Sequence, residues 1–414
     1  MTLIKTSILT AISTGVKVIT GLVINKVLSI YVGPSGLAFV GQLQNFISII
    51  MTFANGAITQ GVVKYTAEYQ SDDVKKSKIF SSALVISLFC SSLSGLFLFL
   101  FSNYLSKLIL HSNEYHSVFK IFGFTIILFA LNTLLMSILN GQKEIKKYIL
   151  VNIISSLFSL VFTSFLIYNF HLIGALYALV LNQSIIFFVT LGFVIKSNWF
   201  KLEYFIQGLD RQNAIKLGKY SLMAITSALM VPMSHLIVRN YIGENLGWDE
   251  AGYWQGIWYI SNIYLMVVTT SLSVYYLPRL SEIKDKNELK KEILNGYKII
   301  MPIVIVLAIS IYLFKELIII LAFTQKFMPM LELFKWQLIG DVIKIASWLL
   351  GMLMLAKAMT KIFIITEVLF SLSFVALSIL FINNFGLVGV TYAFSLNYFI
   401  YLIVMLFIFK RRLL

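Results

Sequence analysis

The sequence predicts an all-α membrane protein of twelve transmembrane helices, arranged as two parallel six-helix repeats around a central cavity. Three observations support this fold class: the composition, the alternation of basic connections, and an internal repeat. The 414-residue chain is 59% hydrophobic and only 12% charged, whereas about a quarter of the residues of a soluble domain are usually charged. So little charge excludes a soluble enzyme whose whole surface faces water.

Twelve apolar segments are each long enough to cross a bilayer, which requires about 20 residues. They run over residues 6–31, 37–64, 78–103, 117–140, 148–169, 173–196, 213–241, 250–278, 292–314, 329–356, 361–383 and 387–409. After the ninth segment, the apolar stretch 317–323 predicts a short extra turn or a re-entrant piece.

Basic residues follow this alternation. Twenty lysines and arginines fall in one set of connections and termini, and three (Lys107, Lys315 and Lys326) fall in the other. Because cytoplasmic connections are enriched in basic residues, both termini are predicted to be cytoplasmic. The net charge of +15 is then explained by membrane topology, and it does not indicate nucleic-acid binding.

The chain also resembles itself at an offset of 215 residues. Eight residues between 169 and 182 recur between 384 and 397, namely Asn169, Phe170, Leu172, Gly174, Tyr177, Ala178, Leu181 and Asn182. Six spans per half give both halves the same orientation, which is typical of parallel repeats that bind substrate at their interface. We therefore predict an N-terminal lobe over 1–197, a cytoplasmic linker over 198–212 and a C-terminal lobe over 213–414.

Ionisable side chains inside a span are costly and mark candidate functional groups. Lys17 lies in the middle of the first span, on a polar stripe with Thr10, Ser13, Thr14 and Gly21. A mid-span ammonium on a polar face predicts an aqueous cavity that binds an anion. The alternative is a structural pair with an acid.

The tenth span carries the most informative stripe, with Gln337, Asp341, Lys344 and Ser347 at helical spacing. Asp341 and Lys344 are three residues apart and can pair directly. They form either a self-neutralising pair or an acid whose protonation switches a neighbouring base. Glu367, in the eleventh span, is a second candidate for proton or cation coupling, or else a structural partner of a base such as Lys357 or Lys361.

Four further polar residues are candidates for substrate contact, each with a structural alternative. Arg239 could grip a phosphate or neutralise the acidic pair Asp249 and Glu250. Lys64 could receive a phosphate at the cavity mouth or serve as a cytoplasmic anchor. Asn45 and Asn55 belong to a polar stripe that suits either sugar hydroxyls or hydrogen bonds between helices.

An aromatic cluster opens the eighth span, with Tyr253, Trp254, Trp258 and Tyr259. We interpret it mainly as part of an aromatic belt at the membrane surface, with sugar stacking as the alternative.

The sequence shows no pattern that requires a cofactor or a metal. It has one cysteine, Cys90, its four histidines lack metal-ligand spacing, and it contains no Gly-rich phosphate loop. No nucleophile–base arrangement is visible either. We predict no enzyme activity, no metal and no cofactor.

Several stretches of the sequence resemble those of a known protein family. They are Tyr31-Val32-Gly33-Pro34-Ser35-Gly36-Leu37, Trp248-Asp249-Glu250, Trp336-Gln337-Leu338, Gly340-Asp341-Val342 with Lys344, and Glu367-Val368. With these residues the chain resembles, nearly end to end, the polysaccharide-precursor flippases of the multidrug/oligosaccharidyl-lipid/polysaccharide exporter (MOP) superfamily. Within that superfamily it is similar to O-antigen translocases and to lipid III flippases of the enterobacterial common antigen.

The resemblance implies two six-helix lobes that move undecaprenyl-pyrophosphate-linked oligosaccharide from the cytoplasmic to the periplasmic leaflet of a bacterial inner membrane. It further implies alternating access driven by a proton or cation gradient. Its partners would be the lipid-linked substrate, membrane lipids, a polysaccharide polymerase and a chain-length regulator. Lys17, Lys64, Arg239 and Lys344 would meet the pyrophosphate.

Two other functions remain as alternatives. The first is a cation-coupled antiporter of drugs or small molecules on the same fold, which an acidic, aromatic cavity would favour over these lysine-bearing stripes. The second is a glycan polymerase, for which a large external loop would be expected, whereas the external connections here are short.

Overall fold

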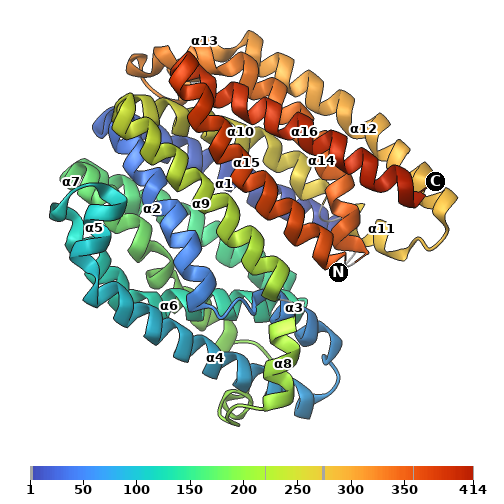
Figure 1. The fold of residues 1–414 in the computed structure, drawn as a ribbon. Helices are drawn as coiled ribbons and strands as arrows, with labels where there is room; N and C mark the ends of the chain where they lie inside the picture. Colours follow the sequence, from blue (N-terminus) through green and yellow to red (C-terminus); the bar gives the residue numbers. More distant parts are fainter. Residues whose placement is uncertain (1–2, 220, 273–275, 358, 414) are drawn as a thin grey trace. The chain divides into compact units, whose positions relative to one another are not determined.

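The structure, a computed structural model, describes residues 3–219, 221–272, 276–357 and 359–413 (Figure 1). Within these ranges it contains helices and short connections and no β-strand, which confirms the all-α prediction. The helices are α1 (Leu3–Tyr31), α2 (Gly33–Ala54), α3 (Thr59–Glu68), α4 (Asp73–Leu100), α5 (Ser102–Leu110), α6 (His116–Gly141), α7 (Ile145–Ile195), α8 (Arg211–Lys219), α9 (Ser221–Asn245), α10 (Trp248–Ser271), α11 (Leu277–Glu282), α12 (Lys286–Leu313), α13 (Lys315–Ala322), α14 (Phe334–Ala356), α15 (Thr360–Phe385) and α16 (Val388–Leu413). Short 3₁₀ helices cover Asn113–Tyr115, Leu202–Phe205 and Gln325–Leu333.

Each of the twelve predicted segments lies mainly in helix over its described residues, with 220 and 273–275 of the seventh and eighth segments outside them. Nine helices among the described residues are long and apolar enough to cross a membrane. One of the nine, α7, is 51 residues long and contains the fifth and sixth predicted spans. Helices α9 and α10, which match the seventh and eighth predicted spans, are not among the nine, so their crossing stays a prediction. The stretch after the ninth span forms the short helix α13.

Contacts divide the chain into two compact units. The N-terminal unit comprises Met1–Val32 and Phe39–Pro232, and the C-terminal unit comprises Gly33–Ala38 and Met233–Leu414. Helices α2 and α9 therefore each begin in one unit and end in the other. The predicted lobes and linker stay a prediction, because these units follow contacts and not the repeat.

In the N-terminal unit, α6 packs against both α4 and α7, and α7 packs against α1. The stretch that follows α7 also packs on this unit. Phe80 of α4 contacts Trp199 and Phe205, with ring centroids 5.8 and 5.5 Å apart, and Ser81 donates a hydrogen bond to the backbone of Gly208 at 2.8 Å.

The internal repeat has a structural counterpart in two helical hairpins. The first reverses inside α7, where His171 has φ 50°, and the second reverses between α15 and α16, where Gly386 has φ 63°. These two residues are 215 positions apart. Asn169 and Asn384, which are equivalent in the same way, each bond a backbone oxygen four residues earlier, at 2.8 and 2.7 Å.

A glycine lets the two arms of each hairpin approach closely. A Cβ atom on Gly174 would lie 2.0 Å from the backbone oxygen of Leu166, and one on Gly389 would lie 2.1 Å from that of Phe381. Leu166 and Phe381 are again 215 positions apart. The residues that match between the two halves of the sequence therefore form the same type of turn in each half.

The second predicted span, 37–64, is wrong as a continuous helix. Helix α2 ends at Ala54 and α3 begins at Thr59. Between them Gly56 and Ala57 both have positive φ, 60° and 52°. Left-handed backbone ends an α-helix, and it begins directly after Asn55, whose own φ is −85°.

The first residues of α2 belong to the C-terminal unit because they dock on the start of α10. The backbone nitrogen of Ser35 donates to Asp249 Oδ1 at 3.0 Å. A Cβ atom on Gly252 would lie 2.0 Å from the backbone oxygen of Pro34. Two of the stretches that carry the family resemblance are therefore in direct contact.

Candidate functional site

The C-terminal unit contains a group of polar and aromatic side chains from four helices that pack on one another. Helices α14 and α16 pack together, and α10 packs against α14. We call this group the polar–aromatic cluster, and it comprises His235 and Arg239 of α9, Trp254, Gln255, Trp258, Ser261 and Tyr264 of α10, Gln337, Asp341 and Lys344 of α14, and Tyr398 of α16.

Asp341 is fully buried and is held by hydrogen bonds. Its Oδ2 accepts from the hydroxyls of Ser261 at 2.6 Å and Tyr264 at 2.9 Å. Its Oδ1 accepts a longer bond, 3.4 Å, from the side-chain amide of Gln337. Burying a carboxylate is costly unless its oxygens are paired, and here three neutral donors provide the pairing.

Lys344 is half-buried and is not paired with Asp341. Among the described residues, its ammonium makes no ion pair with that carboxylate within 4.0 Å. Lys344 Nζ instead lies 5.1 Å from the ring centroid of Trp258 and 5.8 Å from that of Tyr398. Asp341 and Lys344 therefore form no direct ion pair, although their opposite charges still attract each other electrostatically.

Arg239 also lies inside the unit, with 1% of its surface exposed. Its Nη2 donates to Gln255 Oε1 at 2.5 Å, and its guanidinium lies 5.3 Å from the ring centroid of Trp254. One of the two acids that we considered as its partners, Asp249, accepts the hydrogen bond from Ser35 described above. Arg239 is thus placed among aromatic and amide groups of the cluster.

Aromatic rings connect the two cations. The His235 ring lies 4.3 Å from that of Trp258 and 5.6 Å from that of Trp254. Trp254 is fully buried and Trp258 is 6% exposed. The belt interpretation is therefore wrong for these two tryptophans, which face the interior of the unit because they occupy one face of α10.

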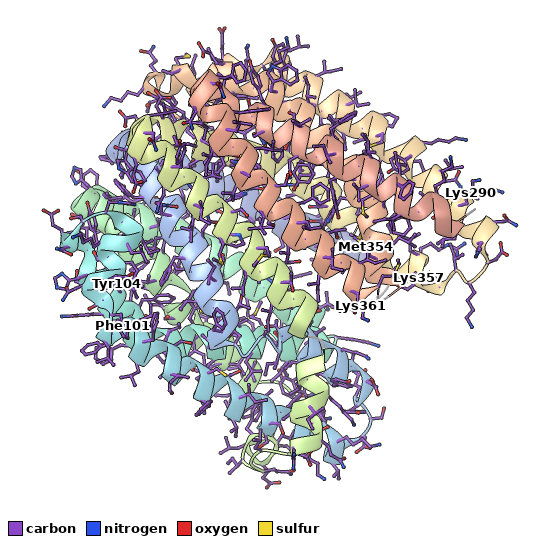
Figure 2. All side chains as sticks on the ribbon, in the orientation of Figure 1. Phe101, Tyr104, Lys290, Met354, Lys357 and Lys361 are labelled. Atoms are coloured by element: carbon purple, nitrogen blue, oxygen red, sulfur yellow. The ribbon has the colours of Figure 1, made fainter. Side chains whose placement is uncertain are left out.

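Glu367, on α15, lies close enough to Tyr398 and Tyr401 to interact with them electrostatically. Lys357, which we considered as its partner, donates a hydrogen bond to the backbone oxygen of Ile283 at 2.5 Å. Lys361 is exposed, and Figure 2 labels both lysines near the connection between α14 and α15.

The candidates in the N-terminal unit lie on separate elements. Lys17 is on an exposed face of α1, and among the described residues of this unit no acid pairs with it. Lys64, exposed on α3, lies 5.1 Å from the ring centroid of Tyr65. Asn45 Nδ2 and Asn55 Oδ1 are buried atoms with no hydrogen-bond partner among the described residues, so both amides retain unused capacity.

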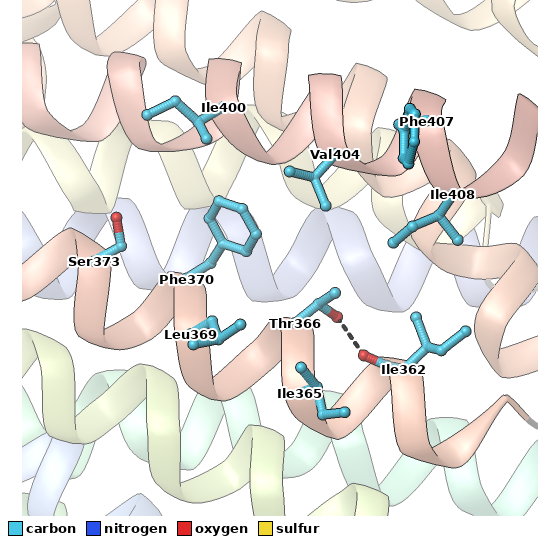
Figure 3. A pocket seen from close by; sticks show the side chains of 10 residues that line it. All are labelled: Ile362, Ile365, Thr366, Leu369, Phe370, Ser373, Ile400, Val404, Phe407 and Ile408. Atoms are coloured by element: carbon cyan, nitrogen blue, oxygen red, sulfur yellow. Dashed lines mark hydrogen bonds between the residues drawn. The ribbon is translucent and has the colours of Figure 1, made fainter.

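A groove of about 800 Å³ runs between α15 and α16 (Figure 3). Its walls are aliphatic and aromatic except for Thr366 and Ser373, and the Thr366 hydroxyl is already bonded to the backbone oxygen of Ile362 at 2.8 Å. Phe370 on its wall contacts Tyr401, with ring centroids 4.7 Å apart. Such walls suit a hydrocarbon chain and not an anion.

Sequence reasoning missed most of the residues that hold the two charged groups of α14, and it named Trp258 only as part of an aromatic cluster. Ser261 and Tyr264 bind Asp341, and Trp258 and Tyr398 face Lys344. Part of this set had a signal, because Trp254, Trp258 and Ser261 are four and three residues apart and so lie on one face of a helix. The contribution of α16 had no such signal, because only tertiary packing brings Tyr398 to Lys344.

The arrangement places a half-buried ammonium against aromatic rings and a buried carboxylate among neutral hydrogen-bond donors. Among the described residues, no group of three or more His, Cys, Asp or Glu side chains comes together.

A family model described as polysaccharide biosynthesis protein matches residues 3–284. Lipid III flippases of Escherichia coli (strain K12) and Shigella flexneri are each 28% identical over 403 residues, which cover 97% of this chain and 96% of theirs. A putative O-antigen transporter of Shigella flexneri is 24% identical over 261 residues, covering 60% of each chain.

Solved transporter structures share the fold. An inward-facing multidrug resistance MATE family transporter of the MOP superfamily aligns with a TM-score of 0.80 at 16% identity, over 96% of this chain and 94% of that one. MATE in complex with MaL6 aligns with a TM-score of 0.74 at 16% identity, over 99% and 96%. At this identity the likeness shows the fold alone. The family match, in contrast, covers more than half of the sequence, and this multi-pass membrane protein therefore belongs to the polysaccharide biosynthesis protein family, on the fold of the MOP superfamily.

Proposed function

We propose that this protein is a flippase that moves undecaprenyl-pyrophosphate-linked oligosaccharide from the cytoplasmic to the periplasmic leaflet. One observation carries the proposal, namely the end-to-end similarity to the lipid III flippases of two bacteria. The family described as polysaccharide biosynthesis protein agrees with such a substrate. The proposed activity is transport and not bond chemistry.

The cluster supports the proposal chemically. A pyrophosphate carries several negative charges and needs cations or hydrogen-bond donors when it leaves water. Lys344 offers an ammonium that makes no direct ion pair with the neighbouring Asp341 among the described residues. We assign pyrophosphate contact to Lys344, Arg239, Lys17 and Lys64.

The remaining candidate residues are assigned to the sugars of the same substrate and to coupling. We assign the amides of Asn45 and Asn55 to sugar hydroxyls, which their unused hydrogen-bonding atoms suit. Asp341 and Glu367 are the candidates for coupling to a proton or cation gradient, since a ligand or proton that favours one conformation shifts the population toward it.

The proposal also covers the cellular location of the protein and its partners. We place the chain in the bacterial inner membrane with both termini in the cytoplasm, because basic connections favour the cytoplasmic side. A polysaccharide polymerase and a chain-length regulator are its proposed partners, since they would receive the translocated unit.

The experiment compares a strain lacking the gene with the same strain carrying it on a plasmid. The deletion should accumulate lipid-linked oligosaccharide on the cytoplasmic side, and the plasmid should clear it. Lys17→Gln, Lys344→Gln and Asp341→Asn should each fail to clear it at unchanged protein levels. A deletion that changes only drug sensitivity would instead support a small-molecule antiporter.

A further inference from the structure

We propose that Trp258, together with Tyr398, is a positioning residue that holds the Lys344 ammonium by its aromatic face and so keeps that charge available to an anionic diphosphate. The inference deepens the proposed function and rests on it for the identity of the anion. It assigns a role to a residue of α10 that touches Lys344 and not the coupling acid.

The geometry comes from three helices of one unit. Lys344 of α14 lies 5.1 Å from the ring centroid of Trp258 on α10 and 5.8 Å from that of Tyr398 on α16. Both distances are within the roughly 6 Å at which the face of an aromatic ring attracts a cation. The ammonium thus has a ring on each of two neighbouring helices.

The nearest acid in the sequence attracts this ammonium electrostatically but makes no direct ion pair with it. Asp341 is turned toward Ser261, Tyr264 and Gln337, which donate to both of its oxygens. A ring stabilises a cation without cancelling its charge, whereas a carboxylate would cancel it. Holding Lys344 by rings therefore leaves its ammonium outside a direct ion pair, where an anionic ligand can bind it.

The Trp258 ring is itself fixed by packing. It is 6% exposed, and its centroid lies 5.1 Å from that of Phe394 and 4.3 Å from that of His235. Its Nε1 is buried and finds no hydrogen-bond acceptor among the described residues. The Trp258 indole therefore contacts Lys344 through the face of its ring. A phenylalanine at this position would keep an aromatic face without losing a hydrogen bond.

The test uses purified full-length protein in detergent, with inorganic pyrophosphate as the probe and isothermal titration as the measurement. The variants are Trp258→Phe, Trp258→Leu, Tyr398→Phe, Lys344→Gln and the double variant Trp258→Leu/Lys344→Gln. Removing the ring should weaken pyrophosphate binding roughly 5- to 30-fold, and Trp258→Phe and Tyr398→Phe should retain most of the affinity. In the Lys344→Gln background, Trp258→Leu should cause no further loss, because its effect passes through Lys344.

A matched control exists on α14. Lys335 Nζ lies 6.0 Å from the ring centroid of Trp336, and this pair lies outside the cluster. Trp336→Leu should leave pyrophosphate affinity unchanged. Thermal unfolding of each variant identifies those whose fold is damaged, and if Trp258→Leu is among them, Trp258→Phe and Tyr398→Leu decide the outcome.

Three results would overturn the inference. They are wild-type protein that does not bind pyrophosphate, Trp258→Phe that loses as much affinity as Trp258→Leu, and additive losses in the double variant. The proposed function is tested by a separate measurement, namely transport of lipid-linked oligosaccharide in proteoliposomes, so its failure can be distinguished from failure of this inference. Pyrophosphate binding that depends on Trp258 and Lys344, without such transport, would keep the site and discard the substrate.

Discussion

At the scale of single residues, the main finding is that two oppositely charged neighbours on α14 use different partners. Asp341 and Lys344 are three residues apart, which favours pairing on an isolated helix. In the folded unit, hydroxyl and amide donors occupy the acid and aromatic rings face the base. Packing between helices therefore overrides the local preference.

The charge of Lys344 is expected to be needed for transport. Lys344→Gln should lower the rate on the order of tenfold or more, since a hydrogen bond to a charged group is worth about 1.5–3 kcal/mol. Lys344→Arg should retain part of the rate, because a guanidinium also stacks on aromatic faces. The measurement is oligosaccharide translocation in proteoliposomes. Lys335→Gln, on the same helix, is the control, and equal losses in both glutamine variants would contradict the assignment.

The hydrogen bonds of Asp341 are expected to stabilise the C-terminal unit. Asp341→Ala leaves the hydroxyls of Ser261 and Tyr264 without their acceptor, which costs about 1–3 kcal/mol. Asp341→Asn keeps an amide oxygen that can accept and should cost less. The thermal unfolding midpoint of the detergent-solubilised protein measures both effects, and a lower midpoint for the asparagine variant than for the alanine variant would refute this account.

At the scale of elements, the repeated hairpin explains why the internal sequence match is strongest between 169 and 182. The match includes a glycine that lets two helices touch and an asparagine that bonds the backbone near the turn. The turn position itself differs, since it is His171 in the first copy and Gly386 in the second, both at positive φ. Both copies of the turn therefore keep a positive φ at this position, although the residue type differs.

The close approach at Gly174 is expected to be intolerant of a side chain. Gly174→Ala would place a Cβ atom 2.0 Å from the Leu166 backbone oxygen, and overpacking of this kind typically costs about 1–3 kcal/mol. Gly192→Ala is the matched control on the same helix, because nothing lies within 4 Å of its Cβ position. Thermal unfolding should show a lower midpoint for Gly174→Ala alone, and an unchanged midpoint would mean that the arms separate easily.

At the scale of the whole molecule, the basic connections predict the topology. Reporter fusions test it, because alkaline phosphatase is active only outside the cytoplasm. A fusion after Leu414 should be inactive as a phosphatase, and one inserted between α9 and α10, near Gly247, should be active. The opposite pattern would reverse the orientation, and equal activity at both points would mean that an even number of helices crosses between Gly247 and the C-terminus, as would happen if α10 did not cross.

The sequence by itself determined the fold class, the positions of the predicted segments and the repeat. Hydrophobic length and loop charge are properties of contiguous stretches, so they can be read without coordinates. The same holds for Asp341 and Lys344 as candidates, because a charge within an apolar run is conspicuous wherever it lies.

Only the tertiary structure decided what those charges touch. Ser261, Tyr264, Trp258 and Tyr398 come from helices other than that of Asp341, Ser261 being 80 residues away from it, and an apolar helix gives few clues to which face meets which neighbour. The break after Ala54 escaped prediction for a related reason, because a stretch apolar enough to cross the membrane does not reveal where left-handed backbone interrupts it. Contacts between distant segments depend on how the helices pack, and that packing is a property of the folded chain and not of any one segment.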